Sequence, residues 1–385
     1  MTRVYVDYAA TTPVDKRVLE AMLPYFREKY GNSLSIHSFG REAKDGIERA
    51  RESIAHLIHA KPDEVFFTSS GTEADNWALI GYCLQNRQCG NHIITSCIEH
   101  LAVLNTCKYL ESLGFSVTYL PVEHDGTLDI DTLRKAFTPQ TILVSIMHVN
   151  NEIGVINDIS AIGAMTKEHG AIFHTDAVQS FGKIPVNVQQ MHIDLLSLSG
   201  HKIYAPKGIG ALYMRTGVHI QKIFHGGRNE RNQRSGTENT TGAVGLGAAA
   251  LLCKAEMEQE GKSLRELCSY FWTEIQKQIP DVRLNGVLEP RLPGNLNVSF
   301  KSADSESILL SLDLHGIAAS SGSACESGSI ELSHVIKALN QPSEYAASAI
   351  RFSLGRWTTR AEIDYTVGTL KEIIERIRKF ESKNT

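Results

Sequence analysis

Short segments that are apolar at nearly every position alternate with helix-like segments through the middle of the chain. Apolar runs of this kind are typical of strands buried on both faces, and the helices between them connect parallel strands. The pattern therefore predicts an α/β fold whose larger part is a mostly parallel, seven-stranded sheet covered by helices. The predicted strands are 65–68, 92–96, 117–120, 141–149, 171–175, 193–199 and 209–214. Polar residues follow several of them, so we expect the chemistry at the carboxyl edge of the sheet, where such sheets bind ligands.

A different pattern begins near residue 265 and predicts a smaller α+β domain. The elements it predicts are strands at 295–300 and 350–354, helices at 305–314 and 333–339, and a last helix. A long helical pattern over 240–278 connects the two regions. We expect a large domain of residues 16–264 and a small domain that combines residues 1–15 with 265–385.

Composition and charge narrow the possible partners. The 385 residues are 42% hydrophobic, which is enough for one large core and a smaller second one. Lysine and arginine number 39 against 43 acidic residues, without long blocks of one sign, so neither a nucleic-acid nor an anionic-membrane surface is expected. The N-terminus lacks a signal-peptide apolar stretch, and the apolar runs are too short to span a bilayer. We therefore expect a cytoplasmic protein that binds a small molecule.

Seven cysteines are scattered along the chain without the regular spacing of a disulfide framework, so we expect reduced thiols. The metal-binding residue types in one region are Cys83, Cys89, His92, Cys97 and His100. Their spacing is irregular and no Cys-x-x-Cys pair occurs, so we predict no metal site.

Two charged residues that follow predicted strands suit pyridoxal 5′-phosphate (PLP). Lys202 comes after strand 193–199, and Asp176 comes after strand 171–175. PLP needs an amine that holds its aldehyde as a Schiff base, and an acid that keeps its ring nitrogen protonated so that the ring withdraws electrons. A lysine in this position is by itself more often a surface residue, so the interpretation depends on the remaining parts of such a site.

The segment after strand 65–68 predicts a phosphate site. Ser70 and Glu73 have the spacing of a capping box, which marks the start of a helix. The free amides at this helix start, together with Gly71 and Thr72, would suit a phosphate group. Neither a Walker lysine nor a Gly-x-Gly-x-x-Gly motif accompanies them, which disfavours a nucleotide cofactor.

Three polar residues are candidates for contacts with the PLP ring. Asn150 and Gln179 would bond the ring hydroxyl, and His100, after strand 92–96, would stack on the ring and move protons. Each of them individually is also compatible with an ordinary loop position.

Several motifs taken together resemble the aminotransferase class V branch of fold-type I PLP enzymes. The motifs are Ser199-Gly200-His201-Lys202, Asp176-Ala177-Val178-Gln179, 70–76 (SGTEADN) and 148–154 (HVNNEIG). Within that branch, segment 320–329 (SSGSACESGS) resembles the catalytic-cysteine loop of group I cysteine desulfurases of the NifS/IscS type, and 234–239 (RSGTEN) matches a NifS-like motif. The resemblance runs from Asp7 to Arg356 and implies a fold-type I PLP-dependent transferase.

The resemblance also implies roles for individual residues. Lys202, Cys325 and His100 would be catalytic, with Cys325 taking the substrate sulfur as a persulfide. Arg351 would clamp the substrate carboxylate, assisted by Asn32 and Asn150. The implied cofactor-binding set is Gly71, Thr72, His100, Asn150, Asp176, Gln179, Ser199, His201, Lys202 and Thr237.

The implied reaction converts L-cysteine to L-alanine and passes the sulfur to an acceptor protein, either an iron–sulfur scaffold or a thiolation carrier. The family forms homodimers, in which Thr237 would reach the phosphate in the neighbouring subunit. The serine and glycine neighbours of Cys325 independently suit a reactive thiol, because such a loop is a poor place for a buried structural one.

Two other functions stay open. A selenocysteine lyase or another β-eliminating PLP lyase would share the ring chemistry, and Cys325 is the residue that argues for sulfur transfer. A non-enzymatic alternative is a catalytically silent scaffold that binds an iron–sulfur assembly partner.

Three residues depart from the usual family pattern without removing a reacting group. Ser33 and Leu332 stand where proline is usual, and Arg228 stands where glycine is usual. Ser33 would loosen the turn that presents Asn32, and Arg228 would add a charge near the active site. Glu326, next to Cys325, adds a negative charge that opposes thiolate formation.

Overall fold

The computed structural model describes residues 3–321 and 332–381. Its largest sheet has seven strands in the order β2-β8-β7-β6-β5-β3-β4. Every neighbouring pair from β7 to β4 is parallel, and β8 is antiparallel to both of its neighbours. The strands are β2 (Val65–Thr68), β3 (His92–Ser96), β4 (Ser116–Leu120), β5 (Thr141–Ser145), β6 (Ile172–Asp176), β7 (Leu195–Ser199) and β8 (Gly210–Met214). The predicted mostly parallel, seven-stranded sheet is confirmed.

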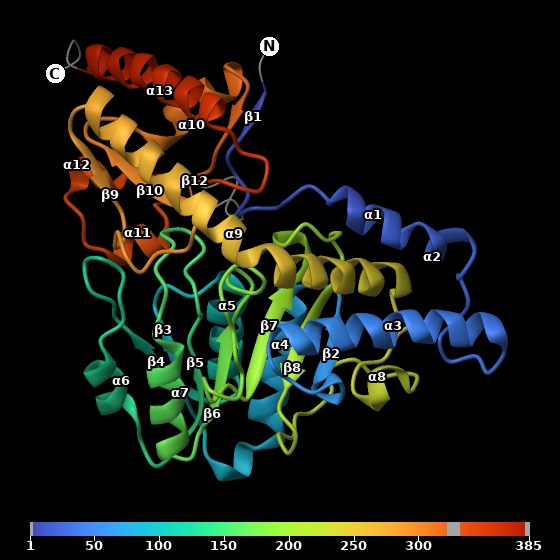
Figure 1. Cartoon of the computed structure of the whole chain (residues 1–385). Helices are drawn as coiled ribbons and strands as arrows, with labels where there is room; N and C mark the ends of the chain where they lie inside the picture. Colours follow the sequence, from blue (N-terminus) through green and yellow to red (C-terminus); the bar gives the residue numbers. More distant parts are fainter. Residues whose placement is uncertain (1–2, 322–331, 382–385) are drawn as a thin grey trace.

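Helices cover both faces of this sheet (Figure 1). Because successive side chains of a strand point to opposite faces, neighbours in β2 enter different cores: Phe67 packs in one and Phe66 in the other. The helices on the Phe67 side are α1 (Lys16–Met22), α3 (Ser38–Leu57), α6 (Ile130–Ala136), α7 (Ile159–Glu168) and the first half of α9 (Thr240–Gln278). The helices on the Phe66 side are α4 (Gly71–Gln85) and α5 (Leu101–Ser112).

A second core lies beyond the end of the large sheet. It packs a three-stranded antiparallel sheet against the end of α9 and against two helices, and Val4 and Val6 from the N-terminus join it. The elements are β9 (Val282–Leu284), β10 (Asn295–Phe300), β12 (Ile350–Ser353), α10 (Ser305–Leu314) and α13 (Arg360–Glu381), with β1 (Val4–Tyr5) paired to β11 (Ile317–Ala318). Figure 1 shows these elements grouped at one end of the molecule.

The helix α9 runs without a break from the first core into the second. The division into residues 16–264 and residues 1–15 with 265–385 therefore stays a prediction, since its second boundary falls inside this helix. The remaining short elements are α2 (Pro24–Arg27), α8 (Asn229–Asn232), α11 (His334–Ala338), α12 (Ser343–Ala346), η1 (Pro62–Glu64), η2 (Arg87–Cys89) and η3 (Gly200–Lys202).

The predicted elements and the observed ones agree closely, with one clear difference. The strand expected over 141–149 ends at Ser145, where β5 stops. Beyond it, His148 and Asn150 form a compact loop that folds back on residues 155–157 through backbone hydrogen bonds. Within the described ranges, no helix is long and apolar enough to cross a membrane.

Candidate active site

An open pocket lies at the carboxyl edge of the large sheet. Residues that follow β2, β3, β6 and β7 line it, because parallel strands bring their carboxyl ends to one edge. The residues expected from the sequence that line this pocket are Gly71, Thr72, His100, Asp176, Gln179, Ser199, His201, Lys202 and Arg351. The predicted location of the chemistry is thus occupied by most of the predicted residues.

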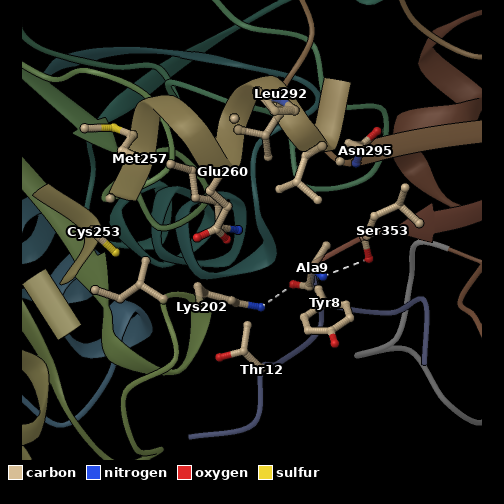
Figure 2. Close-up of a pocket in the computed structure, with 18 of the residues that line it drawn as sticks. Tyr8, Ala9, Thr12, Lys202, Cys253, Met257, Glu260, Leu292, Asn295 and Ser353 are labelled. Atoms are coloured by element: carbon tan, nitrogen blue, oxygen red, sulfur yellow. Dashed lines mark hydrogen bonds between the residues drawn. The ribbon is translucent and has the colours of Figure 1, made fainter. Parts of the chain in front are cut away.

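Lys202 is placed by η3, the short helical turn that directly follows β7. Its Nζ donates hydrogen bonds to the carbonyl oxygens of Ala9 (2.6 Å) and Ala10 (2.8 Å). Figure 2 shows the lysine directed toward Ala9 across the end of a second pocket. The N-terminal segment therefore forms one wall of the site, a contact between residues almost two hundred positions apart.

Asp176 ends β6 and is buried, with one carboxylate oxygen accepting a hydrogen bond from the Val178 amide at 2.8 Å. Burial raises the pKa of this carboxyl group, and the opposing effects of His100, Lys202 and the Val178 amide are smaller. A protonated ring nitrogen beside Asp176 would favour its anionic form, because an opposite charge lowers a carboxyl pKa.

Two more acids are buried around the pocket. Burial raises the pKa of Glu99 to about 8, and burial together with the nearby Asp176 charge raises the pKa of Asp75. One carboxylate oxygen of Asp75 lies 3.6 Å from His174 Nε2 and has no hydrogen-bond partner among the described residues. These buried acids therefore favour bound protons or a positively charged ligand near the pocket.

The first turn of α4 forms one end of the pocket. Ser70 is the N-cap, and its hydroxyl accepts a hydrogen bond from the Glu73 amide at 3.1 Å. A Cβ added at Gly71 would lie 2.6 Å from Val178 Cγ2, so glycine is needed for this close approach. With Gly71 and Thr72 in the lining, the unpaired amides of the first turn face a site suited to an anion.

His100 caps the next helix, α5, with Nδ1 accepting a hydrogen bond from the Ala102 amide at 3.1 Å. Burial lowers the pKa of His100, and Lys202 and His334 lower it further against the raising effect of Asp176. A neutral ring with Nδ1 as acceptor carries its proton on Nε2. To take up a further proton, His100 must release the Ala102 amide.

Arg351, on β12 of the small sheet, closes the pocket from the opposite side. Its guanidinium donates to the Asn151 carbonyl at 3.0 Å and to the Asp7 carboxylate at 2.9 Å. Its Nε is buried and has no hydrogen-bond partner among the described residues. This buried cation, with a donor unpaired, is a suitable partner for a carboxylate.

The structure corrects the expected role of Asn150. Its side-chain amide donates to the Ile98 carbonyl at 2.9 Å, and its oxygen accepts from the amides of Glu152 and Ile153. Asn150 is fully buried and is absent from the pocket lining, whereas its neighbour Asn151 lines the pocket. Asn150 therefore stabilises the loop, because its polar side-chain atoms are already hydrogen-bonded to backbone groups. Asn151, the second asparagine of the pair, faces the site.

Two further expected residues do not reach the pocket within one chain. Asn32 and Thr237 are both exposed and outside the lining. Ser33, expected to loosen the turn, is instead buried and donates a hydrogen bond to Glu238 at 2.6 Å. This bond ties the segment that carries Asn32 to the segment that carries Thr237.

Other expectations concern the cysteine segment and its surroundings. Cys325 and Glu326 lie outside the described residues. Leu332 packs against the small core around Ile98 and α11, and Arg228 is exposed and does not line the pocket. Among the described residues, no group of three or more His, Cys, Asp or Glu side chains is arranged to hold a metal ion.

Four polar or charged lining residues are not among those expected from the sequence: Asp75, Asn151, Glu152 and His334. Asn151 and Glu152 belong to the motif 148–154 (HVNNEIG), which carries a sequence signal for the site but does not show which asparagine faces it. His334 starts α11 and bonds the Glu99 carbonyl at 2.9 Å, a long-range contact with no local sequence signal.

The residues of the pocket fit PLP. An amine and a buried carboxylate share one cavity, and a helix start whose glycine admits no Cβ lies beside them. This donor set matches the aldehyde, the ring nitrogen and the phosphate of that cofactor.

The comparisons with known proteins agree with this chemistry. The Aminotransferase class-V family model matches residues 4–366. A cysteine desulfurase IscS from Dictyoglomus turgidum is 53% identical over 375 residues, which cover 97% of this chain and 95% of that protein. Solved structures of a NifS-like protein (TM-score 0.92, 38% identity, 97% of this chain and 100% of that one) and of SspA in complex with cysteine (0.81, 37%, 92% and 100%) are also similar. The chain therefore belongs to the class-V aminotransferase family, among its cysteine desulfurases.

Proposed function

We propose that the protein is a PLP-dependent cysteine desulfurase that converts L-cysteine to L-alanine and holds the released sulfur as a persulfide. The observation that carries this proposal is the pairing of Lys202 with Asp176 in one pocket, beside the α4 helix start. The similarity to cysteine desulfurases over 97% of the chain, and to a structure with bound cysteine, supports the choice of substrate.

Within this proposal, PLP would be held by three groups. Lys202 Nζ would bind the aldehyde, Asp176 would hold a proton at the ring nitrogen, and the first turn of α4 would bind the phosphate. Bound PLP supplies an electron-withdrawing ring that makes the substrate α-proton acidic. Ser199 and His201, which line the same pocket, complete the proposed cofactor contacts.

The remaining groups of the pocket would orient the substrate and move its protons. The Arg351 guanidinium would release the Asp7 carboxylate and bind the α-carboxylate of the substrate in its place. Lys202 Nζ would then remove the α-proton of the substrate, because Lys202 lies at the edge of the sheet where the substrate would be bound. His100, kept neutral by its lowered pKa, would accept the thiol proton of Cys325 once it releases the Ala102 amide.

Cys325 would supply the nucleophile. Residues on both sides of its segment contact the site: Ser320 pairs with Arg351 through two backbone hydrogen bonds, and Ser333 donates to the Glu152 carboxylate at 2.6 Å. In the proposed reaction, the Cys325 thiolate would attack the substrate sulfur and form the S–S bond as the carbon–sulfur bond breaks. The electron pair of that bond would stay with the substrate carbon, which would then take up a proton. The products are L-alanine and a Cys325 persulfide, and a thiol of an acceptor protein would later take the outer sulfur.

We further propose that the active unit is a homodimer. The large apolar side chains exposed along one side of the molecule are Leu19, Leu23, Phe26, Tyr30, Leu34, Ile36 and Phe39. They belong to α1, α2, the start of α3 and the loop between them, next to the exposed Asn32. A second subunit on this side would cover the apolar surface and bring Asn32 and Thr237 toward a pocket.

We also propose that the protein acts in the cytoplasm with a sulfur-acceptor protein, either an iron–sulfur scaffold or a thiolation carrier. The near-neutral charge balance of 39 basic and 43 acidic residues supports a protein acceptor over nucleic acid.

The test is to incubate the PLP-loaded protein with L-cysteine and to measure alanine by chromatography and persulfide by alkylation and mass spectrometry. We expect alanine with sulfane sulfur on Cys325, and loss of both in Cys325→Ser. If Cys325→Ser keeps full turnover, the chain is a β-eliminating lyase. If the protein cannot bind PLP at all, the silent-scaffold alternative replaces the enzyme.

The cofactor attachment has its own test. Borohydride reduction of the PLP-loaded protein followed by peptide mass spectrometry should find the added mass on Lys202. The mass on any other lysine would contradict the site.

A further inference from the structure

Lys183 lies directly behind the active pocket and has no part in the proposed reaction. It lines a second cavity together with Cys253 and Glu260 of α9. Figure 2 shows Cys253 and Glu260 in this cavity. Lys202 and Ala9 line both this cavity and the active pocket, so they form the partition between the two. A lysine that borders this partition can act on the site without touching the substrate.

Hydrogen bonds connect Lys183 to the catalytic lysine through two intermediates. Lys183 Nζ donates to Gln179 Oε1 at 3.0 Å, and Gln179 Nε2 donates to the Ala9 carbonyl at 2.9 Å. Lys202 Nζ donates to the same carbonyl at 2.6 Å. The Ala9 carbonyl thus receives hydrogen bonds from Gln179 and from Lys202.

The donors and acceptors of these groups favour one orientation of the Gln179 amide over the reversed one. A glutamine amide has an acceptor end and a donor end of nearly the same shape, so its orientation is set by its partners. An ammonium group has donors only. A reversed Gln179 amide would place its NH₂ against the ammonium of Lys183 and its oxygen against the Ala9 carbonyl, and both contacts would be repulsive.

The orientation of Gln179 matters because this residue lines the active pocket. The Ala9 carbonyl uses one of the two hydrogens on Nε2, so the second is directed to a group other than Ala9. In this orientation Gln179 offers the pocket a donor, which suits the ring oxygen of PLP, an acceptor when ionised. A reversed amide would offer that oxygen a second acceptor.

We propose that Lys183 is a positioning residue that fixes the amide of Gln179, so that its N–H groups face the PLP ring oxygen and the Ala9 carbonyl that holds Lys202. This inference rests on the PLP part of the proposed function. It does not depend on which amino acid is the substrate.

The charge of Lys183 also gives the arrangement a pH dependence. Burial lowers the pKa of Lys183 to about 8, with Arg351 of β12 lowering it and Glu260 and Cys253 of α9 raising it. Below that pH the group is an ammonium and donates only. Above it, the neutral amine also accepts hydrogen bonds, so the reversed amide keeps its repulsive contact with the Ala9 carbonyl but no longer has one with Lys183.

The first test compares PLP affinity in the full-length protein, measured by titrating the cofactor into the apo form and following visible absorption. Lys183→Met should weaken PLP binding roughly tenfold, because the Gln179 amide would lose the partner that fixes its orientation toward the ring oxygen. The matched control is Lys254→Met, an exposed lysine on α9 that should change the affinity less than about twofold.

A double-mutant cycle separates a positioning role from a merely structural one. If Lys183 acts through Gln179, then Lys183→Met should have little further effect on PLP affinity in a Gln179→Leu background. The same roughly tenfold loss in both backgrounds would overturn the proposal. So would an unchanged affinity in Lys183→Met alone.

If Lys183→Met does not fold, Lys183→Arg provides the test instead. A guanidinium remains a donor-only group at every accessible pH. The arginine variant should keep PLP affinity near neutral pH and should lose less of it than the wild-type chain when the pH is raised above about 8. Equal losses in the two proteins would contradict the proposed role.

These outcomes are distinct from failure of the proposed function. A wild-type chain that binds PLP but releases no alanine would contradict the desulfurase activity and would leave the affinity test intact. A wild-type chain that binds no PLP would contradict both.

Discussion

At the scale of single residues, the adjacent asparagines Asn150 and Asn151 have different roles. Asn150 satisfies a buried carbonyl and two buried amides, while Asn151 lines the pocket. Both are the same residue type in the same motif, so the difference comes from which way the loop turns each side chain.

Asn150→Ala should destabilise the apo protein by more than about 2 kcal/mol, since each buried group left unpaired costs about 1–3 kcal/mol. Asn151→Ala should leave apo stability within about 0.5 kcal/mol and weaken PLP binding. Urea unfolding and cofactor titration of both variants check this. A stable Asn150→Ala with poor cofactor binding would restore the direct role that the sequence suggested.

A second residue-scale effect concerns pH and the buried histidine His148. Burial lowers its pKa from 6.5 to about 4, and its Nδ1 has no hydrogen-bond partner among the described residues. Between these two values the unfolded chain binds a proton that the folded chain does not, so stability falls as the pH is lowered through this window.

His148→Leu should therefore reduce the slope of the free energy of unfolding against pH, between pH 6.5 and about 4, by up to about 1.4 kcal/mol per pH unit. The exposed His219 provides the control, because His219→Leu should leave the slope unchanged. Urea unfolding at several pH values measures both slopes. Equal slopes in the wild type and His148→Leu would show that His148 does not contribute.

At the scale of elements, the start of α4 combines a helix cap with a close approach. Ser70 caps the helix, and Gly71 lets its first turn lie against Val178, the residue two positions after Asp176. The end of the pocket proposed to bind the phosphate and the end proposed to bind the ring are thereby packed against each other. A substitution that displaces one end of the pocket should therefore displace the other end as well.

Gly71→Ala tests this packing. The new Cβ would meet Val178 Cγ2 at 2.6 Å, and overpacking of this kind costs about 1–3 kcal/mol, so PLP affinity should fall about tenfold or more. Gly368→Ala in α13 is the matched control, because its Cβ would meet nothing within 4 Å. That variant should raise stability by about 0.5–1 kcal/mol and leave the cofactor affinity unchanged. If both variants bind PLP normally, the close approach is not required.

At the scale of the whole molecule, the site depends on segments that are distant in sequence and on surfaces that one chain leaves open. The pocket joins the large sheet, the small sheet through Arg351, and the N-terminal segment through Ala9. Figure 1 places α1, α2 and α3 along one side of the large sheet, where the exposed apolar residues lie.

Phe26→Asp should weaken the proposed dimer by at least about tenfold, because a charge would replace an apolar side chain in the interface. Sedimentation would show the monomer, and PLP affinity should fall with it. Phe380→Asp in α13 is the control: this residue is 71% exposed and lies outside the proposed interface. A wild-type chain that sediments as a monomer while binding PLP fully would contradict the dimer.

Much of the fold followed from local pattern. The strand at 65–68 and the long helix over 240–278 have the bounds that periodicity predicted, because burial on one or two faces leaves a repeat in the sequence. The pocket residues at strand ends could be located for the same reason, since the fold class decides which ends meet. The domain boundary inside α9 and the roles of Asn32, Thr237 and Cys325 stay predictions.

The remaining features have no local signature. The bond from Lys202 to Ala9, the ion pair of Arg351 with Asp7, and the link from Lys183 to Gln179 depend on how side chains are directed in three dimensions. The order of strands and helices, and the residue types available at the sheet edge, follow from the amino-acid sequence, because hydrophobic burial is periodic along the chain. Which of those residues face the pocket depends on the folded chain, because hydrogen-bond partners and packing between distant segments set the direction of each side chain.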